Sequence, residues 1–266
     1  MSVSKASVRR LTESGILLAI AFVLSVIRLM RMPFGGSITL GCMFPVILLA
    51  YRYGTAWGLF SGLAFALLQL LTGLDNLSYA TSFWAAAAIL LLDYLIAYTA
   101  LGLGGIFRRL LPSQSGALLC GTLLCCVLRY LCHVVTGCTV WAGVAVPTAE
   151  GLVYSLTYNA AYMIPETLIT AGIAWYLGRV VDFRPDTPRR VKAEKGGLWT
   201  ALGLLAAVAA VVIAAVWVVV GVQTEEGFVL SRLADPACFL PALGILALGA
   251  VLCAVGFILA KRAERR

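Results

Sequence analysis

Charged residues are scarce in this sequence. Asp, Glu, Lys and Arg make up 12% of the 266 residues, whereas hydrophobic residues make up 62%, and the chain has a single histidine. Soluble domains are about 45–50% apolar and about 25% charged. The composition therefore excludes an ordinary soluble domain and indicates a membrane protein.

Several chemical motifs are also absent from the sequence. It contains no P-loop and no GxGxxG pattern, so energy from ATP would have to come from another chain. None of the eight cysteines forms a CxxC pair, and most lie in apolar runs, where cysteine is a small packing residue. One His with scattered Asp and Glu does not make a metal-ligand set. We expect no metal and no cofactor, and we expect that the chain is not an enzyme.

What the chain does have is a series of long apolar runs. A membrane-spanning helix needs about 20 mostly apolar residues, and continuous rather than alternating runs favour helices over a β-barrel. The sequence predicts an all-α membrane protein with eight spans: 11–28, 37–53, 55–73, 82–106, 115–136, 153–178, 198–222 and 237–260. The GLGG sequence at 102–105 is interpreted as a site of close helix packing.

The basic residues indicate the orientation of these spans. With a cytoplasmic N-terminus, only Arg28, Arg31 and Arg232 of the 20 Lys and Arg residues fall outside, and Arg129 falls within the membrane. This is the positive-inside pattern, which places both termini in the cytoplasm of a multi-pass protein of the plasma membrane. The net charge of +8 thus fits a membrane surface and requires no nucleic acid.

The polar stretch 182–197 (DFRPDTPRRVKAEKGG) is the clearest boundary in the chain. Its prolines and basic residues predict a cytoplasmic linker beside anionic headgroups. We therefore expect a six-helix binding domain at 1–181, the linker at 182–197, and an accessory two-helix transmembrane hairpin with a basic tail at 198–266.

The first span carries small residues at four-residue spacing: Gly15, Ala19 and Val23. Such a face allows another helix to approach closely in a bilayer. It predicts a packing surface, either for another helix of this chain or for a separate partner protein.

Polar side chains interrupt three of the predicted spans. Arg129, His133 and Gly137 share one helix face at four-residue spacing, Asp93 lies beside Tyr94, and Asn159 follows Tyr154 and Tyr158. A charge at the bilayer centre costs about 2.5–3.5 kcal/mol, so such residues normally face a protein interior and serve a function. A carboxylate among aromatic faces, including Trp141 in the following loop, suits a flat organic cation. His and Asn add directional hydrogen bonds.

Other interpretations of these residues remain open. Arg129 and Asp93 form a purely structural salt bridge in one of them, within a membrane scaffold. Another is an intramembrane hydrolase with Ser155 as nucleophile and His133 as base, although no GxSxG motif supports it. Glu166, in YMIPET, is expected to pair locally or to face water rather than to touch a ligand.

Five segments carry a resemblance to a known family: RYLCHVVTG, Trp141, VYSLTYN, LLDYLIAY and MPFGGSITLG. Over roughly residues 8 to 181, the chain resembles the thiamine-specific substrate-binding subunits of energy-coupling factor (ECF) transporters, the ThiT or YuaJ family. The resemblance implies a six-helix protein that captures thiamine from outside. It also implies a coupling transmembrane subunit and two cytoplasmic ATPases as partners, with the small-residue face of the first helix as the docking surface. Another small heteroaromatic compound, such as a pyrimidine precursor, is the alternative substrate.

The resemblance also implies which residues contact the ligand. Asp93 stands where the family has an acidic residue, and six positions match directly: Tyr94, His133, Gly137, Trp141, Tyr154 and Asn159. Trp141 would stack on the aminopyrimidine ring. Asp93, with Asn159 and Tyr94, would hold the charged thiazolium end and the polar groups around it. A family aromatic before the fourth helix aligns near Phe83 or Trp84, with Tyr79 also possible. The chain departs from the family at Phe34–Gly36, where another aromatic is replaced, and in the hairpin 198–260, which the family lacks.

Overall fold

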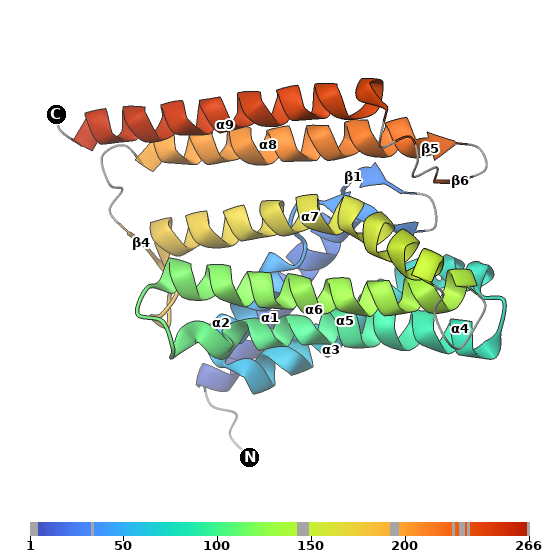
Figure 1. Ribbon diagram of the computed structural model, residues 1–266. Helices are drawn as coiled ribbons and strands as arrows, with labels where there is room; N and C mark the ends of the chain where they lie inside the picture. The colour runs from blue at the N-terminus through green and yellow to red at the C-terminus, as the bar shows by residue number, and fades with distance from the viewer. Residues whose placement is uncertain are drawn as a thin grey trace, which may run out of the picture. The chain divides into compact units, whose positions relative to one another are not determined.

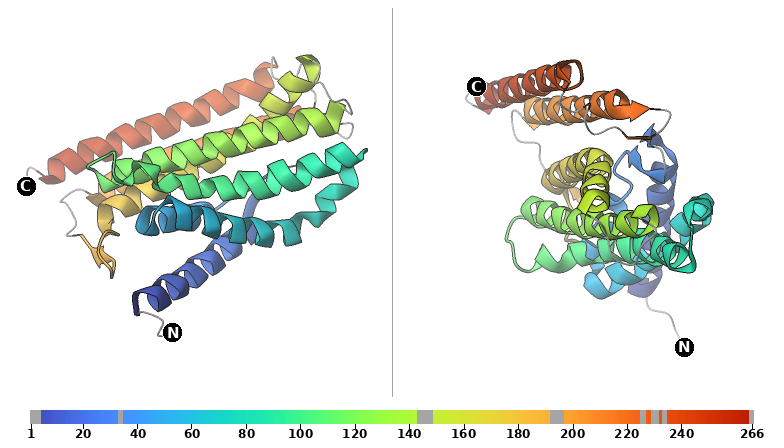
Figure 2. Two further views of the ribbon diagram at one scale, coloured as in Figure 1. Left: turned by 90° about the horizontal axis from the view of Figure 1, so that it is seen from below. Right: turned by 45° about the vertical axis from the view of Figure 1, so that its right-hand side comes forward.

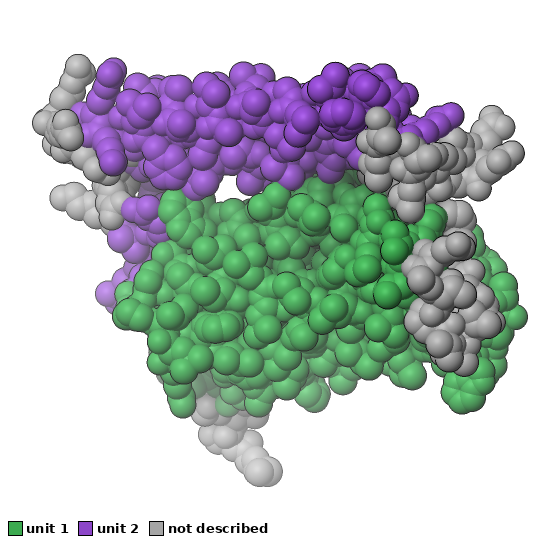
Figure 3. All heavy atoms as spheres, in the orientation of Figure 1, with its two compact units in different colours: residues 1–178, 183–187 green, residues 179–182, 188–266 purple. Residues whose placement is uncertain are grey.

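The computed structural model describes residues 5–32, 35–142, 149–191, 197–224, 227–228, 232 and 235–264. The chain divides into two compact units (Figure 3), which are described here one at a time. Unit 1 comprises Met1–Gly178 and Phe183–Thr187, and unit 2 comprises Arg179–Asp182 and Pro188–Arg266.

Unit 1 is a helical bundle with one short strand pair. Its elements are α1 (Lys5–Val26), β1 (Arg28–Arg31), β2 (Ser37–Thr39), α2 (Phe44–Tyr53), α3 (Thr55–Gly73), η2 (Leu74–Tyr79), a segmented helix made of α4 (Phe83–Ala88), η3 (Ile89–Ile96), α5 (Ala97–Thr99) and η4 (Ala100–Arg108), and the two long helices α6 (Gln114–Ala142) and α7 (Ala149–Val180). The segmented helix packs between α3 and α6, as Figures 1 and 2 show. The predicted all-α membrane fold is confirmed.

Five helical stretches in the described part of the chain have the length and apolar composition to cross a membrane. They are Thr55–Tyr79, Phe83–Arg108, Gln114–Cys138, Gly197–Val222 and Pro236–Ala263. Each overlaps one of the eight predicted spans. The apolar side chains on their outer surfaces, such as Phe60 and Leu71, each 70% exposed, suit contact with lipid.

The predicted span 37–53 is wrong at its N-terminal end. Its helix, α2, begins only at Phe44, and residues 37–39 instead form β2, which pairs antiparallel with β1. Gly41 has a φ of 75°, which an L-residue with a side chain rarely adopts, and Pro45 suits a helix start. The extended Ser-Ile-Thr segment and this turn therefore replace the outer part of the expected helix.

The glycines of the GLGG segment lie where helices meet, as predicted. A Cβ on Gly102 would overlap the backbone of Gly58 and Leu59 in α3, and a Cβ on Gly105 would overlap the carbonyl of Ala50 in α2. Helices in a bilayer associate through such close packing because apolar burial gives no advantage there. These contacts fix the segmented helix against α2 and α3.

A buried cation ties together the predicted cytoplasmic end of unit 1. Arg52 forms an ion pair with Glu13 of α1, and its guanidinium donates to the carbonyls of Phe183, at 2.5 Å, and Asp186, at 3.0 Å. The Tyr53 hydroxyl donates to the same Glu13 carboxylate at 2.6 Å. We call these residues the Arg52 cluster. It joins α1, α2 and the segment 183–187.

Unit 2 is dominated by the pair of helices α8 (Gly197–Val222) and α9 (Pro236–Glu264). It also contains the short strands β3 (Val181–Asp182), β4 (Arg189–Arg190), β5 (Gln223–Thr224) and β6 (Gly227–Phe228). A Cβ on Gly203 would lie 3.2 Å from Gly256 Cα, and one on Gly249 would overlap Ala210. The predicted C-terminal hairpin is therefore present and is closed by a seam of small residues.

Candidate functional site

A cavity of about 200 Å³ lies inside unit 1. Its walls come from α1, the β1–β2 pair, α3, η2, η3, α5, α6 and α7. Most of the residues that line it are polar or aromatic. The complete lining consists of Ser25, Arg28, Gly35, Gly36, Ser37, Thr39, Cys42, Gln69, Thr72, Gly73, Asp75, Asn76, Tyr79, Ile89, Asp93, Tyr94, Tyr98, Arg129, His133, Thr136, Gly137, Tyr158, Asn159 and Tyr162. Ligand sites usually measure about 300–1,000 Å³, so this one is limited to a small molecule.

Asp93 and His133 form the central contact of the cavity wall. His133 Nδ1 lies 2.7 Å from Asp93 Oδ1. The His133 side chain is 10% exposed and that of Asp93 is 25% exposed. On its other side, His133 Nε2 accepts a hydrogen bond from Arg129 Nε at 3.1 Å. The described contacts therefore place His133 between Arg129 and Asp93. The direct Arg129–Asp93 salt bridge, considered from the sequence, is not formed.

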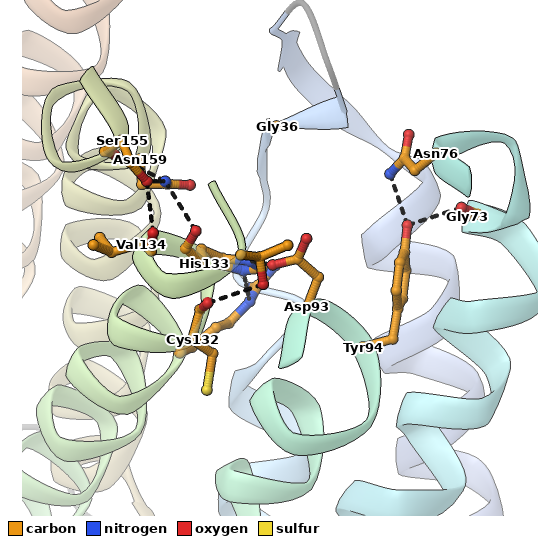
Figure 4. A network of polar contacts seen from close by, with 12 residues as sticks. Gly36, Gly73, Asn76, Asp93, Tyr94, Cys132, His133, Val134, Ser155 and Asn159 are labelled. Carbon is orange, nitrogen blue, oxygen red and sulfur yellow. Dashed lines mark hydrogen bonds and ion pairs between the residues drawn. The ribbon is translucent and has the colours of Figure 1, made fainter. Parts of the chain in front are cut away.

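Asp93 and Tyr94 lie on η3, a π-helical segment with wider turns than an α-helix, and such segments are frequent at functional sites. The two neighbouring side chains diverge: Asp93 faces His133, whereas Tyr94 points toward Gly73 and Asn76 (Figure 4). The Tyr94 hydroxyl donates to the Gly73 carbonyl at 3.0 Å and accepts from Asn76 Nδ2 at 2.7 Å. One short segment thus supplies a carboxylate to one wall and a fixed ring to another.

Asn159 joins α7 to α6 beside the cavity (Figure 4). Its Nδ2 donates to the carbonyls of Ser155, at 2.8 Å, and His133, at 3.2 Å, while its Oδ1 accepts from the Tyr162 hydroxyl at 2.6 Å. A Cβ on Gly137 would overlap Ser155 Oγ, so the glycine lets the helices meet here. The buried amide is therefore held in one orientation, as a hydrogen-bonding group in a cavity wall must be.

Tyrosine rings from α7 form an aromatic wall. Tyr154 and Tyr158 stack with 6.1 Å between ring centroids, and Tyr158 meets Tyr162 edge to face at 5.8 Å. The Gly36 amide donates to the Tyr158 hydroxyl at 3.3 Å, and a Cβ on Gly36 would lie 2.8 Å from the Tyr162 ring. The turn between β1 and β2 can thus approach these rings only because residue 36 is glycine. Their faces can attract a flat cation.

Glu166 is buried and pairs with Thr39, 127 residues earlier in the chain, rather than locally. Its carboxylate accepts hydrogen bonds from the Thr39 amide, at 2.5 Å, and from the Thr39 hydroxyl, at 2.6 Å. Glu166 does not line the cavity, whereas Thr39 does. The carboxylate therefore fastens β2 to α7, and this holds the strand in place as part of the wall.

Five of the nine predicted ligand-binding residues line the cavity: Asp93, Tyr94, His133, Gly137 and Asn159. Tyr154 contributes indirectly by stacking on Tyr158. Phe83 and Trp84 are 78% and 75% exposed and do not line it, whereas the alternative, Tyr79, does. Trp141 is the second-last residue of α6, but its side chain lies outside what the structure describes, as does Phe34. Sequence reasoning did not include Arg28, Gln69, Asp75, Asn76, Tyr98 and Tyr162, which line the cavity as well.

The described contacts do not form the nucleophile–base pair of a hydrolase. The Ser155 hydroxyl donates to the Val134 carbonyl at 2.8 Å, while the two ring nitrogens of His133 contact Arg129 and Asp93. In the part of the chain that the structure describes, no group of three or more His, Cys, Asp or Glu residues could hold a metal ion.

Fold and cavity together define a helical membrane protein with a small-molecule site inside its bundle. Residues 11–182 match the family of the thiamine transporter protein Thia_YuaJ. The chain belongs to this family. The thiamine transporter ThiT of Bacillus subtilis (strain 168) is 33% identical over 201 residues, which cover 70% of this chain and 95% of that protein. A solved structure of ThiT from Listeria monocytogenes matches with a TM-score of 0.51 and 26% identity, over 64% of this chain and 92% of that one.

Proposed function

We propose that this chain is the substrate-binding membrane subunit of an ECF-type transporter and that it captures thiamine from outside the cell. The observation that carries the proposal is the Asp93–His133 pair, which lines a small, partly aromatic cavity in a chain of the thiamine transporter family. Asp93 holds the thiazolium cation, and the tyrosine wall adds cation–π attraction. Tyr94, His133, Gly137, Tyr154 and Asn159 complete the site. Trp141 stacks on the aminopyrimidine, and the aromatic contributed before helix four is Tyr79, which lines the cavity, rather than Phe83 or Trp84.

The domain arrangement follows from the same proposal. Residues 1–181 form the substrate-binding domain, 182–197 the basic cytoplasmic linker, and 198–266 the accessory hairpin. Both termini lie in the cytoplasm of a plasma-membrane protein, because the basic residues gather on that side. ATP is hydrolysed only in the two partner ATPases, since this chain has no phosphate-binding motif.

A fluorescence titration tests the substrate. Thiamine added to the purified chain should quench the fluorescence of its six tryptophans in a saturable manner. The isolated thiazolium half should compete measurably, and the isolated neutral pyrimidine half should compete far less, because only the former carries the charge that Asp93 pairs with. Equal competition by the pyrimidine half and by thiamine would favour the alternative substrate, a pyrimidine precursor. The absence of a saturable response to thiamine would refute the proposal.

The coupling subunit is proposed to dock on the small-residue face of α1, made of Gly15, Ala19 and Val23. Gly15 has open space where a Cβ would project, and Val23 is 57% exposed. Ala19 between them is also exposed. An exposed face of small residues in a membrane helix suits close packing against another helix.

Blocking this face should uncouple transport from binding. Ala19→Trp is expected to reduce co-purification with the coupling subunit at least severalfold while thiamine affinity stays unchanged, because the ring prevents close helix approach. Leu131→Trp, at an exposed position of α6, is the control and should leave co-purification intact. Full complex formation by Ala19→Trp would show that the docking surface lies elsewhere.

A further inference from the structure

Three polar side chains of the cavity, Arg129, His133 and Asp93, contact one another in series. Of the three, Asp93 is the one whose charge can attract a cationic ligand. Arg129 Nε lies 3.1 Å from His133 Nε2, and His133 Nδ1 lies 2.7 Å from Asp93 Oδ1. A guanidinium has donors and no acceptor, so Nε2 must carry a lone pair. The single proton of a neutral imidazole then sits on Nδ1 and is donated to Asp93. In water, free imidazole side chains favour the other tautomer, with the proton on Nε2.

We propose that Arg129 is a positioning residue that fixes this tautomer of His133 and thereby presents Asp93 as an un-neutralised carboxylate to the cationic ligand. The inference rests on the proposed function for the identity of the ligand, though not for the state of the histidine. Among the described residues, Asp93 Oδ2 accepts no hydrogen bond, and Asp93 lines the cavity, so one carboxylate oxygen is held by His133 and the other stays available to a ligand.

Arg129 is itself held rigidly enough for this role. Its residue surface is 8% exposed, and its Nη2 donates to the Tyr98 hydroxyl at 2.9 Å. Its guanidinium also lies over the Tyr98 ring, 4.5 Å from the centroid. Tyr98 meets Phe65 of α3 edge to face at 5.3 Å. Arg129 is therefore fixed on two sides and has one Nε–H to direct at the histidine.

The two contacts of the His133 ring fit one proton, placed on Nδ1. A doubly protonated His133 would oppose its own Nε2–H to the N–H of Arg129. Among the described residues, Asp93 on η3 is the carboxylate that forms an ion pair with the ring. Other titratable groups also face this region: near the imidazole they are Tyr162 on α7, with its ring 6.0 Å away, and Cys132 on α6. Around Arg129 they are Tyr98 on α5, Glu166 on α7 and Cys42 before α2. Across the cavity they are Arg28, Asp75, Tyr79, Tyr94 and Tyr158.

Because a second proton on Nε2 would face the Arg129 Nε–H, we expect the binding of thiamine to change little between pH 8 and about pH 5. Without Arg129, His133 can accept a second proton as the pH falls. The resulting imidazolium would pair with Asp93 and cancel the charge that attracts the ligand. Arg129→Met should therefore bind thiamine at least tenfold more weakly at pH 5.5 than at pH 8, whereas the wild-type chain should change less than threefold. A packing defect alone would weaken binding at both pH values equally, and that result would overturn the proposal.

Because His133 is the chain's single histidine, its tautomer can be read directly. The full chain labelled with ¹⁵N-histidine and studied by NMR without ligand should show a protonated Nδ1 and an unprotonated Nε2 across this pH range. A proton on Nε2, or an imidazolium at neutral pH, would overturn the inference even if Arg129→Met fails to fold. Arg129→Lys, which keeps a donor and the charge, should restore most of the pH independence. Failure of wild-type binding would instead reject thiamine as ligand and leave the NMR result standing.

Discussion

Replacing Asp93 by Asn should weaken thiamine binding more than any other single change in the cavity. Asn has nearly the same shape, and its Oδ1 can still accept from His133 Nδ1, so the wall stays in place while the charge disappears. Removing one partner of a desolvated charge pair costs about 2–5 kcal/mol. Since about 1.4 kcal/mol corresponds to a factor of ten, the affinity should fall about 30-fold or more. The thiamine fluorescence titration measures this loss.

Asp75→Asn is the matched control for this prediction. Asp75 also lines the cavity, but it is exposed and lies on η2, in which no described residue is buried. Water and salt screen its charge, so the affinity should change less than about threefold. Equal losses in the two variants would mean that overall negative potential attracts thiamine and that Asp93 has no specific contact with it.

The second large effect should appear in stability. Arg52→Met removes the cation from the Arg52 cluster, so the Glu13 carboxylate keeps the Tyr53 hydroxyl as a donor but loses its counter-charge, and the carbonyls of Phe183 and Asp186 lose the guanidinium. The Arg52 side chain is 3% exposed and that of Glu13 is 21% exposed. Breaking a buried pair from one side costs about 3–5 kcal/mol, so the free energy of unfolding should fall by about that amount. Thermal denaturation in detergent would show a clear decrease in Tm.

Two further variants isolate the cause of that decrease. Arg9→Met removes an ion pair to Asp186 that is 3.4 Å long and largely exposed, and it should cost at most about 1 kcal/mol. Adding Glu13→Gln to Arg52→Met should recover part of the lost stability, because the lone carboxylate disappears. If Arg52→Met has the same Tm as the wild-type chain, the Arg52 cluster contributes little to the stability of the fold.

The sequence was most informative where polar residues interrupt apolar helices. Asp93, His133 and Asn159 stood out because a charge or amide in a bilayer is costly, and the structure brings all three to one cavity. The same signal was available in Gln69, a buried amide on α3 that bonds to Ser25, and it was overlooked. The polar character of a residue inside a span was thus a reliable guide.

The same reasoning failed where the backbone departs from a regular helix. Asn76 and Asp75 lie in η2, at the end of a span, where polar residues are ordinary and attract no notice. Phe83 and Trp84 lie before the π-helical segment η3, which contains Asp93. Because the turns of this segment are wider, counting 3.6 residues per turn does not predict whether these two side chains lie on the same side of the helix as Asp93. The exchange of helix for strand at 37–39 depends on Gly41 and on pairing with β1, which is a tertiary contact.

The C-terminal helices contribute no described residue to the lining of the cavity. Every described residue that lines the cavity falls between Ser25 and Tyr162, well before α8 begins at Gly197. The seam between α8 and α9 is closed by glycines of these two helices. Among the described residues, substitutions after Gly197 therefore leave the lining of the cavity itself unchanged.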